Sequence, residues 1–309
     1  MTALAAVATY LPEERVPIEA LAGGLGLTEM QVKVFRRYHK LAEVRLDRQG
    51  SLTDLLRNAV TRLDALRGNE HRVRYVLYAR SLPVVVPFPL NPLHEVCRRT
   101  GLSHATAFTV THHACASGLL AVDLAGRLLA ADPDRDALAL VLAGEKAFTP
   151  DAQLVPETSV FGEGAAACLI RHGGPRDRLL SYAVDLHGGL EHGSVEDVSR
   201  FQREYPATLA ATIEAAVDRA GLDLADLKLI LPHNVNVVAW QRVCRQLKVP
   251  LDRVVLDNIP VTGHVFCADA FFNYQTACRA GRLDPGDRYV VAAAGIAGGA
   301  TFSAMVFEH

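Results

Sequence analysis

The hydrophobic positions along the chain follow two alternating patterns. Short apolar runs rich in β-branched residues are separated by longer segments in which apolar residues recur every three to four positions. The first pattern predicts strands buried on both faces and the second predicts amphipathic helices, so we expect an α/β protein. Strands are predicted at 73–78, 107–111, 137–143, 165–171, 227–231, 254–256, 289–294 and 302–307. Helices are predicted at 53–66, 91–100, 116–131, 200–220, 235–247 and 269–280.

The order of these elements is the same in two parts of the chain. In each part a helix, a strand and a helix with a Val-Cys-Arg triplet are followed by a strand, a turn, a helix and a strand. The turn holds Cys115 in the first part, and His264 lies near the same position in the second. The repeat predicts two similar halves, 1–172 and 173–309, whose turns converge on one site.

Composition argues against several classes of protein. The 309 residues carry a formal net charge of −2, and no basic block indicates nucleic-acid binding. No apolar run approaches the roughly 18 residues that span a bilayer, and the N-terminal stretch lacks the positive flank of a signal peptide. The six cysteines are scattered without a Cys-x-x-Cys pair, which favours reduced thiols in a cytoplasmic protein. Nucleotide-binding and metal-ligand motifs are also missing, so we expect no cofactor and no metal.

Cys115 is the first candidate for chemistry. It follows an apolar run and opens a segment with helical periodicity. A thiol at a helix N-terminus meets unpaired backbone N–H groups and the positive end of the helix dipole, which stabilise the thiolate. A lone cysteine is more often a small buried hydrophobe. Three distant features nevertheless favour a nucleophile that forms a covalent intermediate.

Two histidines and a glycine-rich turn are these three features. His233 directly follows the predicted strand 227–231, where α/β sheets place functional groups, and His264 lies in a loop just before a helix. Taken alone, each histidine is more often a helix cap or a turn residue. Gly298 and Gly299 lie between two strands, where a tight turn can expose a backbone N–H. That N–H and the N–H of Cys115 can together form an oxyanion hole.

The motifs, taken in order, resemble the thiolase superfamily and most closely its ketoacyl-acyl carrier protein (ACP) synthase III branch. They are Ala114-Cys115-Ala116-Ser117-Gly118, Phe161-Gly162-Glu163-Gly164, Pro232-His233-Asn234-Val235-Asn236, Gly263-His264 and Gly298-Gly299-Ala300-Thr301. The resemblance implies a five-layer αβαβα sandwich of two pseudo-symmetric halves, usually a homodimer. It also implies that Cys115 takes an acyl group from a CoA or carrier-protein thioester. His233 would donate a hydrogen bond to the thioester oxygen or an enolate.

The chain departs from this branch at several positions. The third catalytic position is typically asparagine, and here it is His264, which can titrate and so transfer protons. The tryptophan that stacks on CoA adenine in the family has no counterpart nearby, because the only tryptophan is Trp240. A carrier protein or a non-CoA thioester is therefore the favoured donor. Additional candidate pocket residues are His112, His113, Asn234 and Phe88, the last reaching the partner subunit's pocket.

These observations predict an acyltransferase that forms a Cys115 acyl-thioester and condenses it by C–C bond formation. The departures favour a specialised, secondary-metabolite pathway over primary fatty-acid initiation. Acyl transfer to an oxygen or nitrogen acceptor stays open, with a histidine as base, as does a cyclase that acts on a β-keto intermediate. A non-catalytic thiolase-fold subunit is the remaining alternative. Retention of Cys115, both histidines and the glycine loop argues against it.

Overall fold

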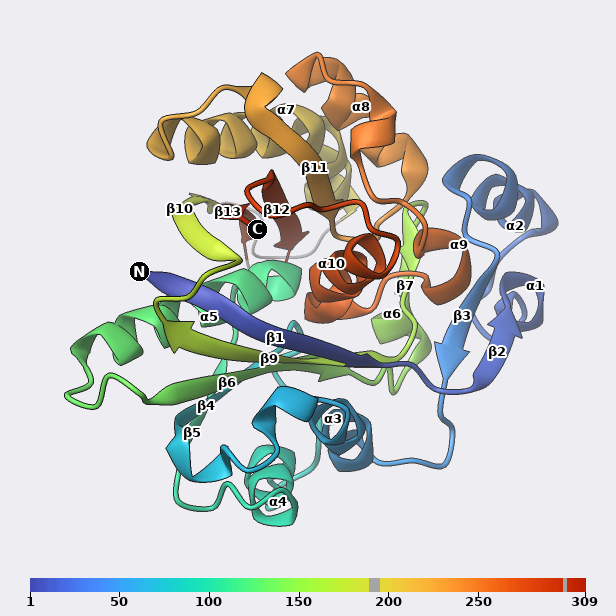
Figure 1. Ribbon diagram of the computed structural model, residues 1–309. Helices are drawn as coiled ribbons and strands as arrows, with labels where there is room; N and C mark the ends of the chain where they lie inside the picture. The colour runs from blue at the N-terminus through green and yellow to red at the C-terminus, as the bar shows by residue number, and fades with distance from the viewer. Residues whose placement is uncertain (189–194, 297–298) are drawn as a thin grey trace.

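A mixed sheet of nine strands forms the centre of the computed structural model, which describes residues 1–188, 195–296 and 299–309. The strands are β1 (Thr2–Tyr10), β4 (Val73–Ala79), β5 (Thr106–Val110), β6 (Leu138–Glu145), β9 (Gly164–His172), β10 (Arg178–His187), β11 (Leu227–Pro232), β12 (Arg288–Ile296) and β13 (Ala300–Glu308). Their order is β11-β12-β13-β10-β1-β9-β6-β4-β5. Only the Ala3–Arg178 pair joins β10 to β1, so the sheet divides there into two layers (Figure 1).

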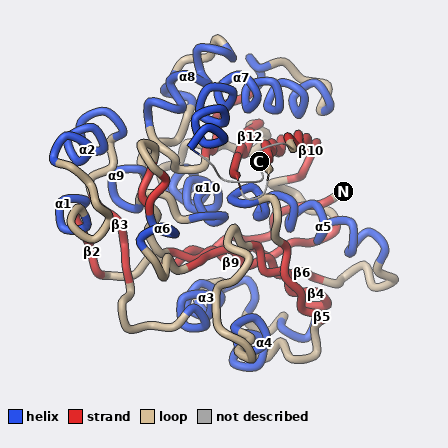
Figure 2. Tube along the Cα trace, turned by 180° about the vertical axis from the view of Figure 1, so that it is seen from behind, coloured by secondary structure: helices blue, strands red, loops and turns tan. Residues whose placement is uncertain are grey.

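Six helices complete a five-layer αβαβα sandwich and confirm the predicted fold class. They are α3 (Leu52–Thr61), α4 (Pro92–Arg99), α5 (Ser117–Ala131), α7 (Val195–Arg219), α8 (Val237–Leu247) and α10 (Asp269–Arg279). α7 and α8 cover the four-strand layer, α5 and α10 lie between the two sheet layers, and α3 and α4 cover the five-strand layer (Figure 1). Figure 2 shows the same order from behind. Every residue of β6 is buried because helices cover both of its faces.

The central helix α5 is apolar because it packs against both sheet layers. Ala121, Val122 and Ala125 are fully buried in the cluster that fills the space between the layers. In the described residues, 114–131 is the one helical stretch with the length and hydropathy of a membrane span, so the expectation that no apolar segment approaches that length is wrong. Its place in the core accounts for that composition.

Most predicted elements are present, with three differences. The strand predicted at 254–256 is absent, since Val254 makes only an isolated bridge to Ile230. The helix predicted at 53–66 ends earlier, at Thr61, and a short 3-10 turn, Asp64–Leu66, follows it. Near the N-terminus, β2 (Glu14–Pro17), β3 (Glu43–Leu46), α1 (Ile18–Leu21) and α2 (Glu29–Val34) form a small lateral unit that the sequence pattern did not resolve. Its core packs against Ile259 of α9 (Ile259–Thr262), the helix that leads into the His264 loop.

The two central helices begin in the same way. A three-residue 3-10 turn precedes each of them, Ala114–Ala116 before α5 and Phe266–Ala268 before α10. Cys115 and Cys267 are the middle residues of these turns, so the counterpart of Cys115 is Cys267. His264, which the sequence repeat placed there, lies three residues earlier. The halves 1–172 and 173–309 stay a prediction; β9 ends at His172 and β10 begins at Arg178.

Candidate active site

Cys115 lies on a strained turn at the start of α5. Ala114, the residue before it, has a φ of 46°, a conformation that residues with a side chain rarely adopt. The thiol is buried, with 8% of the residue exposed, and it lines a cavity together with both candidate histidines. Backbone strain of this kind persists only where the surrounding structure enforces it, and it is concentrated at functional sites.

Gly295, near the end of β12, packs directly against the Cys115 turn. A Cβ atom at this position would lie 2.5 Å from the Ala114 Cβ and 2.7 Å from the Cys115 nitrogen, so only glycine fits. The glycines predicted for the oxyanion hole are Gly298 and Gly299. Gly298 lies outside the described residues, and Gly299 has a φ of 131° next to the carbonyl of His187. The oxyanion hole stays a prediction, and Gly295 is the glycine that contacts the Cys115 turn.

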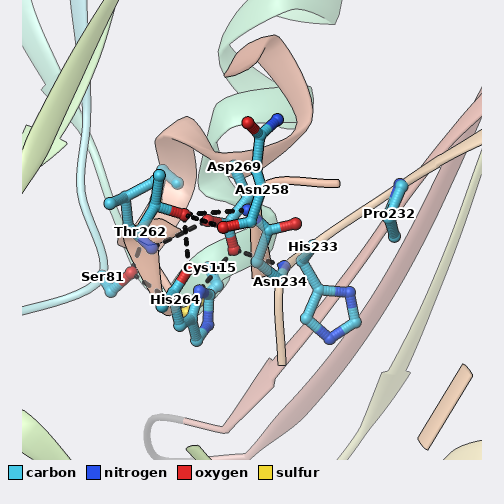
Figure 3. A network of polar contacts seen from close by, with 12 residues as sticks. Ser81, Cys115, Pro232, His233, Asn234, Asn258, Thr262, His264 and Asp269 are labelled. Atoms are coloured by element: carbon cyan, nitrogen blue, oxygen red, sulfur yellow. Dashed lines mark hydrogen bonds and ion pairs between the residues drawn. The ribbon is translucent and has the colours of Figure 1, made fainter. Parts of the chain in front are cut away.

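Backbone hydrogen bonds and aromatic stacking fix the position of His264. The backbone N–H of His264 donates to the Val160 carbonyl at 3.1 Å, and its backbone carbonyl accepts from the Gly162 N–H at 2.9 Å. The Phe161 ring stacks on the His264 ring with centroids 4.4 Å apart. These contacts hold the buried His264 in one orientation beside Cys115 (Figure 3).

Asp269, the first residue of α10, is the charged partner of His264. One carboxylate oxygen forms an ion pair with Nδ1 of His264 and accepts from the Asn234 N–H at 2.6 Å. The other accepts from the Val265 N–H at 2.7 Å. Burial lowers the pKa of His264, but the negative charges of Asp269 and the Cys115 thiolate outweigh burial and raise that pKa to about 10. The His264 ring is therefore protonated near pH 7.

His233 has the opposite electrostatic character. It directly follows β11, its N–H donates to the Ala292 carbonyl at 3.0 Å, and its carbonyl accepts from the Trp240 indole at 2.9 Å. Its ring centroid is 5.9 Å from that of His264. Burial and the neighbouring His264 charge lower the pKa of His233 to about 3, so this ring is neutral near pH 7. A neutral imidazole can donate one hydrogen bond to a substrate oxygen.

Ser81 connects Cys115 to a second thiol and to a buried carboxyl group. Its Oγ donates to the Cys115 Sγ at 3.4 Å and lies 3.4 Å from the Cys267 Sγ. The backbone N–H groups of Ser81 and Leu82 donate to Glu145 at 2.6 and 2.7 Å. Burial raises the pKa of Glu145 to about 7 even though these hydrogen bonds lower it.

Ser81, Glu145, Asp269 and Gly295 were missed by sequence reasoning. Asp269 offered a weak signal, because it opens the helix that follows the His264 loop. Ser81 and Glu145 each end a strand region without any motif. Their roles become visible only when the strand ends meet in space.

The cavity at this site has a volume of about 550 Å³. Cys115, His233 and His264 line it together with apolar side chains such as Leu154, Val235 and Ile296. Charged and polar groups, among them Asp151, Glu157, Arg242 and His39, also line it.

The remaining predicted pocket residues lie elsewhere. His112 is exposed and His113 is half-buried, and neither is among the described residues that line the cavity. Asn234 is buried, but its side-chain oxygen accepts from Asn273 at 2.8 Å, so it belongs to the network behind the histidines. Phe88 is 98% exposed on its loop. Within the described part of the chain no cluster of His, Cys, Asp and Glu is arranged to hold a metal ion.

Comparison with known proteins gives consistent matches. The family model for the 3-oxoacyl-[acyl-carrier-protein (ACP)] synthase III C terminal matches residues 217–309. The β-ketoacyl-[acyl-carrier-protein] synthase III of Ruegeria pomeroyi is 26% identical over 329 residues, covering 98% of this chain and 97% of the relative. The 3-oxoacyl-[acyl-carrier-protein] synthase III structure from Aquifex aeolicus has a TM-score of 0.85 at 19% identity and covers both chains fully. ChlB3, named an acyltransferase, has a TM-score of 0.85 at 19% identity and covers 99% of this chain and 97% of its own.

Proposed function

Because the chain belongs to the ketoacyl-ACP synthase III-like condensing enzymes of the thiolase superfamily, we propose that Cys115 carries an acyl group. The acyl group comes from a thioester and passes to a carbon nucleophile bound in the same cavity. One observation supports this proposal above all. A cysteine at a helix start shares a cavity with a proton-carrying His264 and a neutral His233.

The first half-reaction uses Cys115 and His264. The Cys115 thiolate attacks the thioester carbonyl, and a bond forms between its sulfur and the carbonyl carbon. The bond to the donor sulfur breaks, and the departing thiolate takes the proton of the His264 ring. The acyl group then remains on Cys115 beside a neutral His264.

The second half-reaction depends on His233. As a neutral ring in an apolar, buried place, it donates a hydrogen bond to the thioester oxygen of the second substrate. This bond stabilises the enolate that forms when the second substrate loses CO2 or gives a proton to the neutral His264. The enolate carbon attacks the acyl carbonyl, a C–C bond forms, and the Cys115 thiolate leaves.

An acyl carrier protein is the donor that we favour. The names of the relatives include the acyl carrier protein, and we propose the same kind of donor for this chain. Trp240 is fully buried and its indole bonds to His233, so it is not available to stack on the adenine of CoA. The specialised pathway, the homodimer, the cytoplasmic location and the placement of Phe88 in a partner's pocket belong to the same proposal.

A second candidate function is acyl transfer to an oxygen or nitrogen acceptor. The pairing of His264 with Asp269 favours it, because a neutral histidine held by a carboxylate is the usual base for a hydroxyl or amine. ChlB3, a fold relative, is named an acyltransferase. In this reaction His264 takes the acceptor's proton while the acceptor atom attacks the acyl carbonyl.

Product analysis separates the two functions. The protein is incubated with acyl-ACP and acyl-CoA donors, and then with a malonyl thioester, an alcohol or an amine, with Cys115→Ala as the control. Cys115-dependent formation of a β-keto thioester supports condensation. An ester or amide supports the second candidate. Failure of every donor to transfer its acyl group would contradict both.

A further inference from the structure

We propose that Asp269 is the positioning residue of this site, since its carboxylate holds His264 and the His233 loop together and keeps a proton on His264 beside Cys115. Neither the sequence motifs nor the similar proteins assign this role. The inference rests on the proposed function in one respect, namely that Cys115 is the nucleophile.

The surroundings of Asp269 leave His264 as its counter-charge. Asp269 is 1% exposed, and a buried carboxylate is costly unless a cation and hydrogen bonds compensate for it. In the described ranges its single ion-pair partner is His264. The two backbone N–H groups of Asn234 and Val265 satisfy its oxygens but carry no charge. The fold therefore favours a protonated His264 ring.

The same carboxylate links the two histidine loops. Asn234 directly follows His233, and Val265 directly follows His264, so Asp269 binds the backbone next to each catalytic histidine. Figure 3 shows Asp269 together with Asn234 and His264, the two labelled residues that it contacts. Asn273 extends it by donating to the Pro232 carbonyl at 2.7 Å. Loss of Asp269 is thus expected to affect both loops.

Chemically, the pair supplies and recovers one proton. The protonated His264 stabilises the Cys115 thiolate and then gives its proton to the departing thiolate of the donor. Because Nδ1 contacts Asp269, the other ring nitrogen is the one available to Cys115 and to substrate. An acceptor that brings a proton returns it to His264 and restores the starting pair. After decarboxylation, which releases no proton, solvent water supplies the proton instead.

Other titratable groups face this pair from the surrounding elements. Ser81 contacts Cys115 and Cys267, Glu145 contacts Ser81 and Cys267, and Arg80 acts on Glu145. The His233 ring lies next to the His264 ring, Tyr205 contacts His233, and His39 and Arg242 line the cavity. Glu145 is the one buried carboxyl group among them, and it belongs to the site. The matched control is therefore Asp132→Asn, because Asp132 is a buried carboxylate, 4% exposed, that follows the last residue of α5 at the end opposite Cys115.

Alkylation of Cys115 tests the proposal without any acyl donor. Rates with iodoacetamide are measured from pH 5 to 9 by peptide mass spectrometry on the full chain and on Asp269→Asn, Asp269→Glu and Asp132→Asn. We expect Asp269→Asn to react about tenfold more slowly at pH 7, with its profile moved about one pH unit upward. Asp269→Glu should recover part of the rate, and Asp132→Asn should stay within about twofold of wild type. An unchanged profile for Asp269→Asn, or the same shift in Asp132→Asn, overturns the proposal.

A second variant covers the case in which Asp269→Asn does not fold. His264→Gln removes the proton carrier and leaves Asp269 in place, so we expect the same upward shift, and a wild-type profile would overturn the proposal. The proposed function is tested separately. A protein with Asp269-dependent alkylation that accepts no acyl group would contradict acyl transfer alone.

Discussion

Cys115 and Cys267 occupy equivalent positions at the starts of the two central helices, and one hydroxyl contacts both of them. Each is the middle residue of a 3-10 turn whose first residue has a positive φ, 46° for Ala114 and 53° for Phe266. The Oγ of Ser81 lies 3.4 Å from each sulfur. The two thiols differ in their neighbours, because Cys115 lines the cavity with His264 and Cys267 lies within 4.0 Å of the Glu145 carboxyl. Burial raises the pKa of Cys267 well above its usual range, so this thiol stays protonated although its position matches that of Cys115.

The contact between Gly295 and the Cys115 turn gives the first prediction. In Gly295→Ala, the new methyl group meets the backbone nitrogen of Cys115 at 2.7 Å, so the turn must move. We expect roughly a 10²-fold loss of acylation rate, as is typical when a catalytic group moves by about 1 Å. Gly23→Ala is the control, because no atom lies within 4 Å of the added group. Equal rates in the two variants would show that the turn does not need Gly295.

Glu145 gives a prediction for the pH dependence of stability. Its pKa in the fold is about 7, above the ordinary 4.5, so between these pH values unfolding releases a proton. Rising pH therefore lowers the free energy of unfolding in this window, by at most about 1.4 kcal/mol per pH unit. Glu145→Gln removes this contribution. We expect the stability of the variant relative to wild type to increase from pH 4.5 to 7, measured by urea unfolding.

The low pKa of His233 acts in the opposite direction. Because His233 is kept neutral in the fold, it lowers the free energy of unfolding as pH falls from 6.5 toward 3. Wild type and Glu145→Gln share this effect. The difference between Glu145→Gln and wild type therefore isolates Glu145. A difference that is constant with pH would mean that Glu145 ionises normally in the fold.

His233 should matter more for the second half-reaction than for the first. His233→Ala removes the hydrogen-bond donor for the enolate, and we expect product formation to fall roughly 10²- to 10³-fold. Acylation of Cys115, followed by intact mass, should fall much less. His233→Gln keeps an N–H donor and should recover part of the rate. Tyr205→Phe removes only the hydroxyl 3.4 Å from the ring, and it serves as the control. An equal loss in both half-reactions would assign His233 to acylation instead.

The fold and the position of Cys115 at the start of a helix could be predicted from the sequence because their signals are local. Apolar runs such as 137–143 and helical periodicity such as 116–131 depend on nearby residues, and burial of β6 and α5 follows directly. Cys115 was found from its place between a strand and a helix. The predicted strand 254–256 failed because a short apolar run next to a sheet does not by itself form a ladder.

The supporting residues could not be predicted because their meaning depends on distant partners. Asp269 is an ordinary first-turn acidic residue until the His264 loop lies against it. Gly295 and Ser81 gain their roles only where β12 and the end of β4 reach the Cys115 turn. The repeat misplaced the counterpart of Cys115 by three residues, since motif spacing alone does not fix the register of a turn.

The most direct test is the intact mass of the protein after incubation with acyl-ACP and acyl-CoA donors. We expect wild type and Cys267→Ala to gain the mass of one acyl group, and Cys115→Ala to gain none. Peptide mapping should place the group on Cys115. A mass gain that persists in Cys115→Ala, or no gain in wild type with any donor, would contradict the proposal that Cys115 carries the acyl group.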